Sequence, residues 1–422
     1  MTELSPVRVR LALLALALGG FAIGTTEFVA MGLLPEIARD TLPALSAADP
    51  DAAIAQSGLV ISAYALGVVV GAPTIAALAA RFPRRELLLA LAVAFTVGTV
   101  ASALAPSFGL VVAARFLAGL PHGAYFGIAA LVAASLMGPG RRGQGVAMVL
   151  SGLTVANIVG VPAVTFLGQV AGWRVAYLVV AAIFAVTAVT VRLALPPMAG
   201  DAGATMRREL GALRRGQVWF ALGIGSIGFG GFFAVYSYVA PLTTEVTGLP
   251  ADRVPLVLVV GGVGMTVGNL LGGRLADRGA LRAVYLLLPA LIAALVLLAL
   301  ISRWPLGLFL GVFLVGAATA AVSPAIQTRL MDVAGESQTL AAAINHSSLN
   351  VGNSLGAALG GAVIAAGLGF VAPTWVGVAL GALGLLLAVG SGLVERRATA
   401  SGGSARGTDR SPRGSTTGAE GA

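Results

Sequence analysis

Twelve apolar runs dominate this sequence, and each is long enough to cross a lipid bilayer as one helix. A crossing helix needs about 20 apolar residues, so twelve of them occupy roughly 240 residues. Only 10% of the 422 residues are charged, which leaves little chain for a folded domain outside the membrane. The sequence therefore predicts an all-α membrane protein with twelve transmembrane helices. The runs lie near residues 10–35, 57–79, 86–105, 107–134, 144–170, 174–195, 217–243, 254–276, 281–301, 305–328, 338–368 and 373–394.

The placement of the cationic side chains indicates how these helices are oriented. All 26 are arginines, and the chain has no cysteine, which excludes disulfides and thiol nucleophiles. Short loops on the cytoplasmic side of a membrane hold most of the basic residues. With the N-terminus inside, four arginines lie outside, Arg115 lies within a span, and the remaining 21 are inside. We therefore expect a plasma (inner) membrane protein with both termini cytoplasmic, whose charge of +9 faces the membrane and not a nucleic acid.

An internal repeat divides the chain into two halves of six spans. The LAAR segment at 78–81 matches LADR at 275–278, at an offset of 197, and VANIVG at 155–160 matches VGNSLG at 351–356, at an offset of 196. Repeated halves of this kind are typical of transporters that rock around a cavity at the membrane midplane. The expected units are an N-terminal half at 1–195, a basic cytoplasmic linker at 196–216, a C-terminal half at 217–394 and a disordered cytoplasmic tail at 395–422.

At these motifs the sequence resembles the major facilitator superfamily, over about residues 8–396. Residues 273–279 (GRLADRG) resemble its loop signature, and residues 115–119 (RFLAG) its span-4 signature. Residues 24–36 (GTTEFVAMGLLPE) are similar to the first span of the arabinose-efflux and chloramphenicol-exporter group of the twelve-span drug:proton antiporters. The resemblance implies the major facilitator fold and export of small molecules driven by protons.

The fifth span resembles the antiporter signature of the drug:proton branch, although Val161 separates its usual Gly-Pro pair. The residues that carry this likeness are Gly152, Gly160, Pro162 and Gly168.

Two charged residues lie deep within predicted spans. Glu27 is the only carboxylate there and Arg115 the only arginine. Both lie roughly 13 Å below the outer surface, at 1.5 Å per helical residue. Charges at such a depth are costly, so each should face a cavity or a partner. We predict that the two are energetically coupled and take part in proton coupling, with a static ion pair as the alternative.

The two histidines, His122 and His346, lie in the fourth and eleventh spans. A lone buried imidazole is more often a hydrogen-bonded packing group than a proton relay. His122 follows Pro121, whose ring should kink the helix beside the cavity, so His122 joins the proton-coupling candidates.

Aromatic and amide side chains are candidates for the substrate cavity. Phe229, Phe233 and Tyr236 gather aromatic surface in the seventh span, where an apolar drug could stack or where the rings only pack. Asn345 and Asn350 in the eleventh span could bind substrate or could bond across helices. Both readings stay open for each group.

The loop after the eighth span is a candidate gate. Asp277 and Arg278 keep the superfamily's charges there, whereas Ala80 stands in place of the aspartate in the first-half loop. Asp277 could hold a facing helix N-terminus or an arginine such as Arg142 when the cytoplasmic side is closed.

Glycines spaced four apart predict faces where helices cross closely. One set is Gly119, Gly123 and Gly127, and the other is Gly352, Gly356 and Gly360.

These observations predict a secondary transporter and not an enzyme. We expect a monomer in the lipid bilayer that exports small drug-like molecules, such as phenicols, with no cofactor other than the proton gradient. Exporters of sugars or other metabolites are the alternative. A remote one is an intramembrane hydrolase, because residues 352–356 (GNSLG) match a serine-hydrolase elbow, but His346 is too far along the helix from Ser354.

Overall fold

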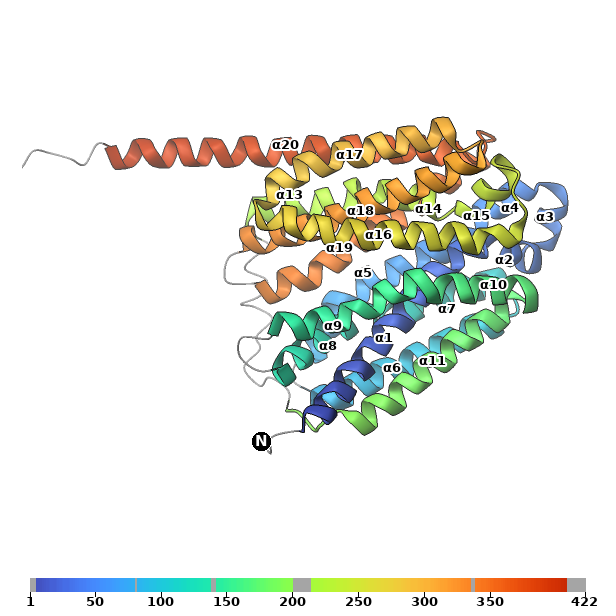
Figure 1. Ribbon diagram of the computed structural model, residues 1–422, viewed down its shortest axis with the longest axis horizontal. Coiled ribbons are helices and arrows are strands. Elements are labelled where there is room, and N and C mark those ends of the chain that lie inside the picture. The colour runs from blue at the N-terminus through green and yellow to red at the C-terminus, as the bar shows by residue number, and fades with distance from the viewer. Residues whose placement is uncertain (1–4, 80–81, 138–141, 200–213, 335–337, 408–422) are drawn as a thin grey trace, which may run out of the picture.

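The computed structural model describes residues 5–79, 82–137, 142–199, 214–334 and 338–407, and in these ranges it contains helices and no strands. Two sets of helices lie side by side and converge toward the end that holds α2, α3 and α4 (Figure 1). We call this end the short-helix end, and the end where α1 begins the terminal end. The first set comprises α1 (Pro6–Gly32), α2 (Leu34–Thr41), α3 (Pro43–Ala48), α4 (Pro50–Ser57), α5 (Leu59–Ala79), α6 (Arg84–Leu104), α7 (Phe108–Gly119), α8 (His122–Met137), α9 (Arg142–Val155), η1 (Ala156–Gly160), α10 (Val161–Ala171) and α11 (Trp173–Ala194).

The second set follows residues 200–213, which lie outside the described residues together with most of the predicted linker. It comprises α13 (Gly216–Gly223), η3 (Ile224–Gly228), α14 (Gly230–Tyr236), α15 (Val239–Pro241), η4 (Leu242–Val246), η5 (Ala251–Arg253), α16 (Val254–Asp277), α17 (Ala280–Ile301), α18 (Pro305–Ala334), α19 (Gln338–Ala365) and α20 (Ala372–Gly407). We refer to the two sets as the N-terminal and C-terminal halves.

The predicted twelve-span fold is confirmed. Eleven stretches among the described residues are long and apolar enough to cross a membrane, and α19 completes the set. Its middle carries histidine, asparagine and serine, so it is less apolar than the others. Protein surrounds these polar side chains, since Asn345 and Asn353 are 2% and 0% exposed. A polar helix is tolerated in a membrane where its polar face is covered by protein.

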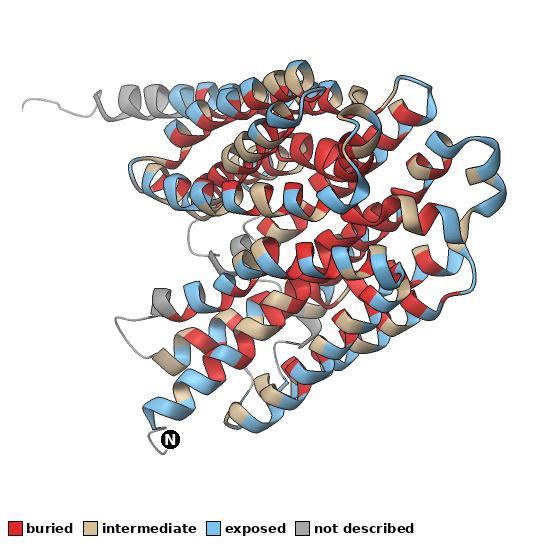
Figure 2. Cartoon of the chain, turned by 45° about the vertical axis from the view of Figure 1, so that its right-hand side comes forward, coloured by how far each residue is buried: buried red, intermediate tan, exposed pale blue. Residues whose placement is uncertain are grey.

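Buried residues concentrate between the helices, and exposed ones lie on the outer faces (Figure 2). Many of the exposed side chains are large and apolar, including Leu193 and Leu306. An apolar outer surface of this kind suits contact with lipid tails. The halves meet along two seams, α5 against α19 and η1 with α10 against α16. In the first seam, Ser62 donates a hydrogen bond from Oγ to the carbonyl oxygen of Ser354 at 3.2 Å.

Two local breaks follow from the sequence. The fourth span is interrupted at Pro121, between α7, which ends at Gly119, and α8, which begins with His122, at the position that the proline predicts. In the fifth span the π-helical turn η1 immediately precedes Val161. A π-helical turn holds one residue more than an α-helical one, which suits the extra residue between Gly160 and Pro162.

One expectation about the chain's end is wrong. Helix α20 continues to Gly407, so residues 395–407 are helical and not part of a disordered tail. Extending an existing helix costs far less than starting one, and no proline interrupts this stretch. The ion pair of Glu395 with Arg329, at 2.9 Å, also holds the beginning of the extension. Residues 408–422 lie outside the described residues.

Candidate functional site

Glu27 lies in α1 at the interface between the two halves, and it is 7% exposed. Asn353 of α19 donates a hydrogen bond from Nδ2 to its Oε1 at 3.4 Å. The neighbouring aromatic ring, Phe28, contacts Phe233 and Tyr236 of α14, at 6.3 and 6.0 Å between ring centroids. The carboxylate of the first half is therefore in contact with a polar group of the second half, and the adjacent Phe28 is in contact with its aromatic groups.

Arg115 is fully buried in α7, but it does not form the direct contact with Glu27 that its depth suggested. Its Nη1 donates to Oγ1 of Thr26 at 3.1 Å and its Nη2 to the carbonyl oxygen of Thr26 at 3.0 Å. Among the described residues no ion pair within 4.0 Å joins the guanidinium to Glu27. Arg115 and Glu27 do lie at a similar depth, because Thr26, which Arg115 binds, is next to Glu27 in the chain. Helix α1 presents the Thr26 oxygens to Arg115 instead, so the two charges form no direct ion pair, and their energetic coupling stays a prediction.

Tyr64 of α5 connects Arg115 to the histidines. The guanidinium carbon lies 4.1 Å from the centroid of the Tyr64 ring, and the Tyr64 hydroxyl is 3.1 Å from Nδ1 of His122. His346 of α19 reaches this group from the other half, with its ring 6.4 Å from that of His122 and stacked on Phe126 at 5.6 Å and 3°. Sequence reasoning did not single out Tyr64, although a hydroxyl within an apolar span is a usable signal.

The predicted cavity residues Phe229, Phe233, Tyr236, Asn345 and Asn350 are all buried. Phe233 and Tyr236 reach the seam with α1 through the aromatic contacts with Phe28. Asn345 and Asn350 differ from the three aromatic residues in one respect. Each has a buried side-chain oxygen, Oδ1, that accepts no hydrogen bond. The role of all five in binding substrate stays a prediction.

The antiporter-like glycines allow α1 to approach the fifth span. A Cβ at Gly152 would overlap the backbone of Ala17, and one at Gly168 would lie 2.5 Å from a methyl group of Leu33. A Cβ at Gly160 would lie 2.5 Å from Oγ1 of Thr25. Pro162 is the second residue of α10, directly after the π-helical turn η1 within one continuous span. Close packing against α1 accounts for this pattern.

The predicted gate is described only in part. Arg278 follows the end of α16 and is exposed. The side chains of Asp277 and Arg142 lie outside the described part of the structure, so their contact stays a prediction.

Comparison with known proteins agrees with this architecture. A sequence model of the Major Facilitator Superfamily matches residues 16–302 and 241–415. The chain belongs to the major facilitator superfamily. It is 42% identical over 384 residues to the inner membrane transport protein YdhP of Escherichia coli (strain K12), a match that covers 90% of this chain and 96% of that protein. It is 33% identical over 382 residues to a chloramphenicol resistance protein of Streptomyces lividans, covering 90% and 95%.

The crystal structure of a D-xylose-proton symporter has the same fold, with a TM-score of 0.73 at 17% identity, covering 91% of this chain and 97% of that one. The chain is a multi-pass membrane transporter with the major facilitator fold.

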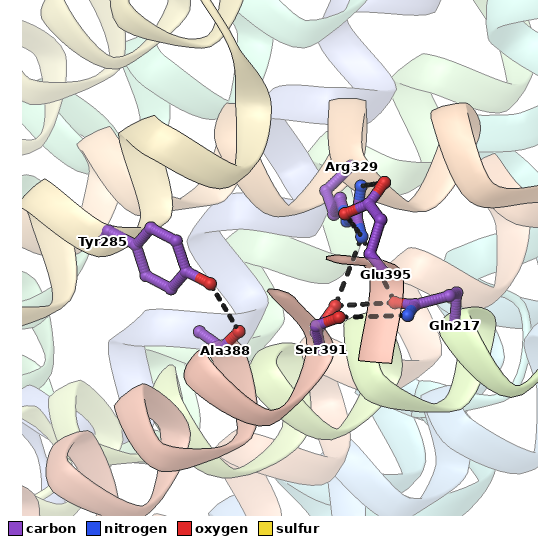
Figure 3. Close-up of polar contacts among 6 residues, drawn as sticks. All are labelled: Gln217, Tyr285, Arg329, Ala388, Ser391 and Glu395. Atoms are coloured by element: carbon purple, nitrogen blue, oxygen red, sulfur yellow. Dashed lines mark hydrogen bonds and ion pairs between the residues drawn. The ribbon is translucent and has the colours of Figure 1, made fainter. Parts of the chain in front are cut away.

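This major facilitator transporter also has a buried arginine that sequence reasoning missed. Arg329 of α18 is 7% exposed and binds both carboxylate oxygens of Glu395, at 3.2 and 2.9 Å. Its Nη2 also donates to Gln217 of α13 and to Ser391 of α20, both at 3.2 Å (Figure 3). The cluster holds three helices of the C-terminal half together. Arg329 directly follows the predicted span at 305–328, so sequence reasoning did not place it in a buried position.

Proposed function

We propose that this transporter is a proton-coupled exporter of small drug-like molecules in the plasma (inner) membrane, with both termini cytoplasmic. One observation carries the proposal: Glu27, the one buried carboxylate among the described side chains, meets Asn353 across the interface between the halves. When the halves rock, this contact must loosen and the surroundings of the carboxylate must change. A change of surroundings alters the proton affinity of a carboxyl group, which couples proton binding to the rocking motion.

The exported class and the cellular location rest on the relatives. One is named an inner membrane transport protein and another a chloramphenicol resistance protein. The proton gradient supplies the energy, and the chain acts as a monomer without a cofactor.

A sugar or metabolite exporter is the second candidate. It is favoured by the buried amide oxygens of α19, which suit a ligand rich in hydroxyl groups. The hydrolase alternative finds no support, because His346 contacts His122 and Phe126 instead of Ser354.

The test is transport into inverted membrane vesicles that contain the purified chain. An imposed proton gradient should drive uptake of chloramphenicol by the native protein and not by Glu27→Gln. Glu36→Gln, the same change outside the spans, is the matched control. Gradient-driven uptake of pentoses alone would favour the second candidate, and uptake that ignores the gradient would refute proton coupling.

A further inference from the structure

One face of α19 carries a polar stripe that points at the N-terminal half. We define the α19 stripe as His346, Asn350 and Asn353, which are four and three residues apart and therefore share a helix face. Its ends touch the other half: His346 stacks on Phe126, and Asn353 binds Glu27. Asn350 lies between these two contacts, so the face that carries it is turned toward the same interface.

The two asparagines of the stripe present acceptor atoms without partners. Asn350 donates from Nδ2 to the carbonyl oxygen of His346 at 3.0 Å, and Asn353 donates from Nδ2 to Glu27. Because a backbone carbonyl can only accept, the orientation of the Asn350 amide is determined, and its Oδ1 is the free atom. Both Oδ1 atoms are buried and have no hydrogen-bond partner. Buried acceptors without donors are unfavourable, so a ligand that brings donors would relieve them.

The charge around the stripe favours an uncharged ligand. Glu27 and Arg115 are the two formally charged groups of the site, and they carry opposite signs. The guanidinium lies against the oxygens of Thr26 beside Glu27, so the two charges largely cancel over the distance of a ligand. A lipophilic cation would gain little net attraction here.

Flat rings lie near the stripe. Phe126 and His346 are parallel to within 3°, and Phe28 stacks with Phe233 at 16°. Asn350 and Asn353 are separated by about 4.5 Å along the helix axis, a distance that donors on neighbouring carbon atoms of a small molecule can cover. The site therefore combines ring surface with closely spaced acceptors.

We infer that the substrate of this transporter is an uncharged molecule that carries an aromatic ring and several hydroxyl or amide N–H donors. The donors bind Oδ1 of Asn350 and of Asn353, and the ring lies against Phe126 and His346. This inference rests on the proposed function and names the substrate class of the same site.

The first experiment measures equilibrium binding to the purified native protein in detergent, without a proton gradient. Two probes belong to the class: chloramphenicol, and a nitrophenyl arabinoside. Three further probes lie outside the class: chloramphenicol diacetate has its hydroxyls blocked, D-arabinose lacks an aromatic ring, and tetraphenylphosphonium is charged and has no donors. We expect both class members to bind at least about tenfold more tightly than the other three, the effect of roughly one well-made hydrogen bond.

The second experiment repeats the binding assay with Asn350→Leu, which keeps the volume and removes the acceptor. Affinity for chloramphenicol should fall about tenfold, while the diacetate should be unaffected. Ser348→Ala is the matched control, since Ser348 bonds within its own half, to Leu222 and Ser226. If Asn350→Leu does not fold, the comparison of blocked and free hydroxyls on the native protein decides.

The inference is overturned if neither class member binds, or if the diacetate, the cation or the pentose binds as tightly as they do. These binding outcomes do not depend on whether transport is coupled to protons. Binding that follows the class, together with uptake that ignores the gradient, would refute proton coupling and leave the substrate class intact.

Discussion

Asn353 in α19 and Glu27 in α1 lie 326 residues apart in the chain and are joined by a hydrogen bond of 3.4 Å. This bond crosses between the two halves. It places the only acid predicted deep in a span against the most polar spanning helix. Relative motion of the halves must therefore change the polar contacts of that acid.

Glu27→Gln should abolish proton-driven efflux while membrane insertion stays intact. The amide has nearly the shape of the carboxyl group, yet it cannot take up or release a proton. Efflux in vesicles with an imposed gradient is the measurement, and Glu36→Gln serves as the control. Gradient-driven transport at the native rate in Glu27→Gln would refute the assignment of Glu27 as a proton-coupling residue.

Arg115→Lys should destabilise the protein although it keeps the charge. An ammonium group cannot reproduce the two-point contact with Thr26 or the guanidinium's position over Tyr64. The expected loss is about 2 to 4 kcal/mol, measured by thermal unfolding in detergent. Arg174→Lys, at the partly exposed ion pair with Asp40, should lose less than about 1 kcal/mol. Equal losses at both sites would contradict the burial argument.

Gly119→Ala and Gly127→Ala should have opposite effects, although both glycines belong to one predicted face. A Cβ at Gly119 would overlap the backbone oxygen of Tyr64, whereas one at Gly127 meets nothing within 4 Å. We expect Gly119→Ala to lower the free energy of unfolding by roughly 1 to 3 kcal/mol. Gly127→Ala should raise it by about 0.5 to 1 kcal/mol through higher helix propensity. A similar loss in both variants would show that Gly127 is also closely packed, and no loss in Gly119→Ala would show that the crossing at Gly119 is not as close as described.

Glu36→Gln should stabilise the protein at neutral pH and not at acidic pH. Burial raises the pKa of Glu36 in α2, against a weaker opposing effect of Arg39 at 3.3 Å. The folded state thus holds the proton more tightly than the unfolded chain, so the carboxylate formed as the pH rises weakens the fold. The gain in unfolding temperature should be present at pH 7 and should vanish below the ordinary glutamate pKa of about 4.3.

Arg39→Gln should change the stability in the opposite direction to Glu36→Gln. Removing the cation leaves the partly buried Glu36 carboxylate less compensated, so the variant should be less stable than the native protein at neutral pH. Unfolding temperatures of Glu36→Gln that follow the native ones at every pH would refute this account.

The sequence could reveal features that depend on neighbours along the chain. Run lengths placed the spans, Pro121 placed the break before His122, and the spacing of Gly352, Gly356 and Gly360 marked a close crossing. At each of these three, an added Cβ would lie within 3 Å of the backbone of η3 or α14. Gly127 is the exception, because a spacing does not show whether a partner helix reaches that far.

What the sequence determined by itself is the set of spanning helices and the depth of Glu27 and Arg115, since hydrophobic length and rise per residue are local properties. Tertiary structure alone decided which groups meet at that depth. A guanidinium has several acceptors within reach, and the rotation of each helix about its axis selects among them. That rotation is set by packing with helices distant in the chain. This rotation places Thr26 in contact with Arg115, Asn353 in contact with Glu27, and His346 beside His122.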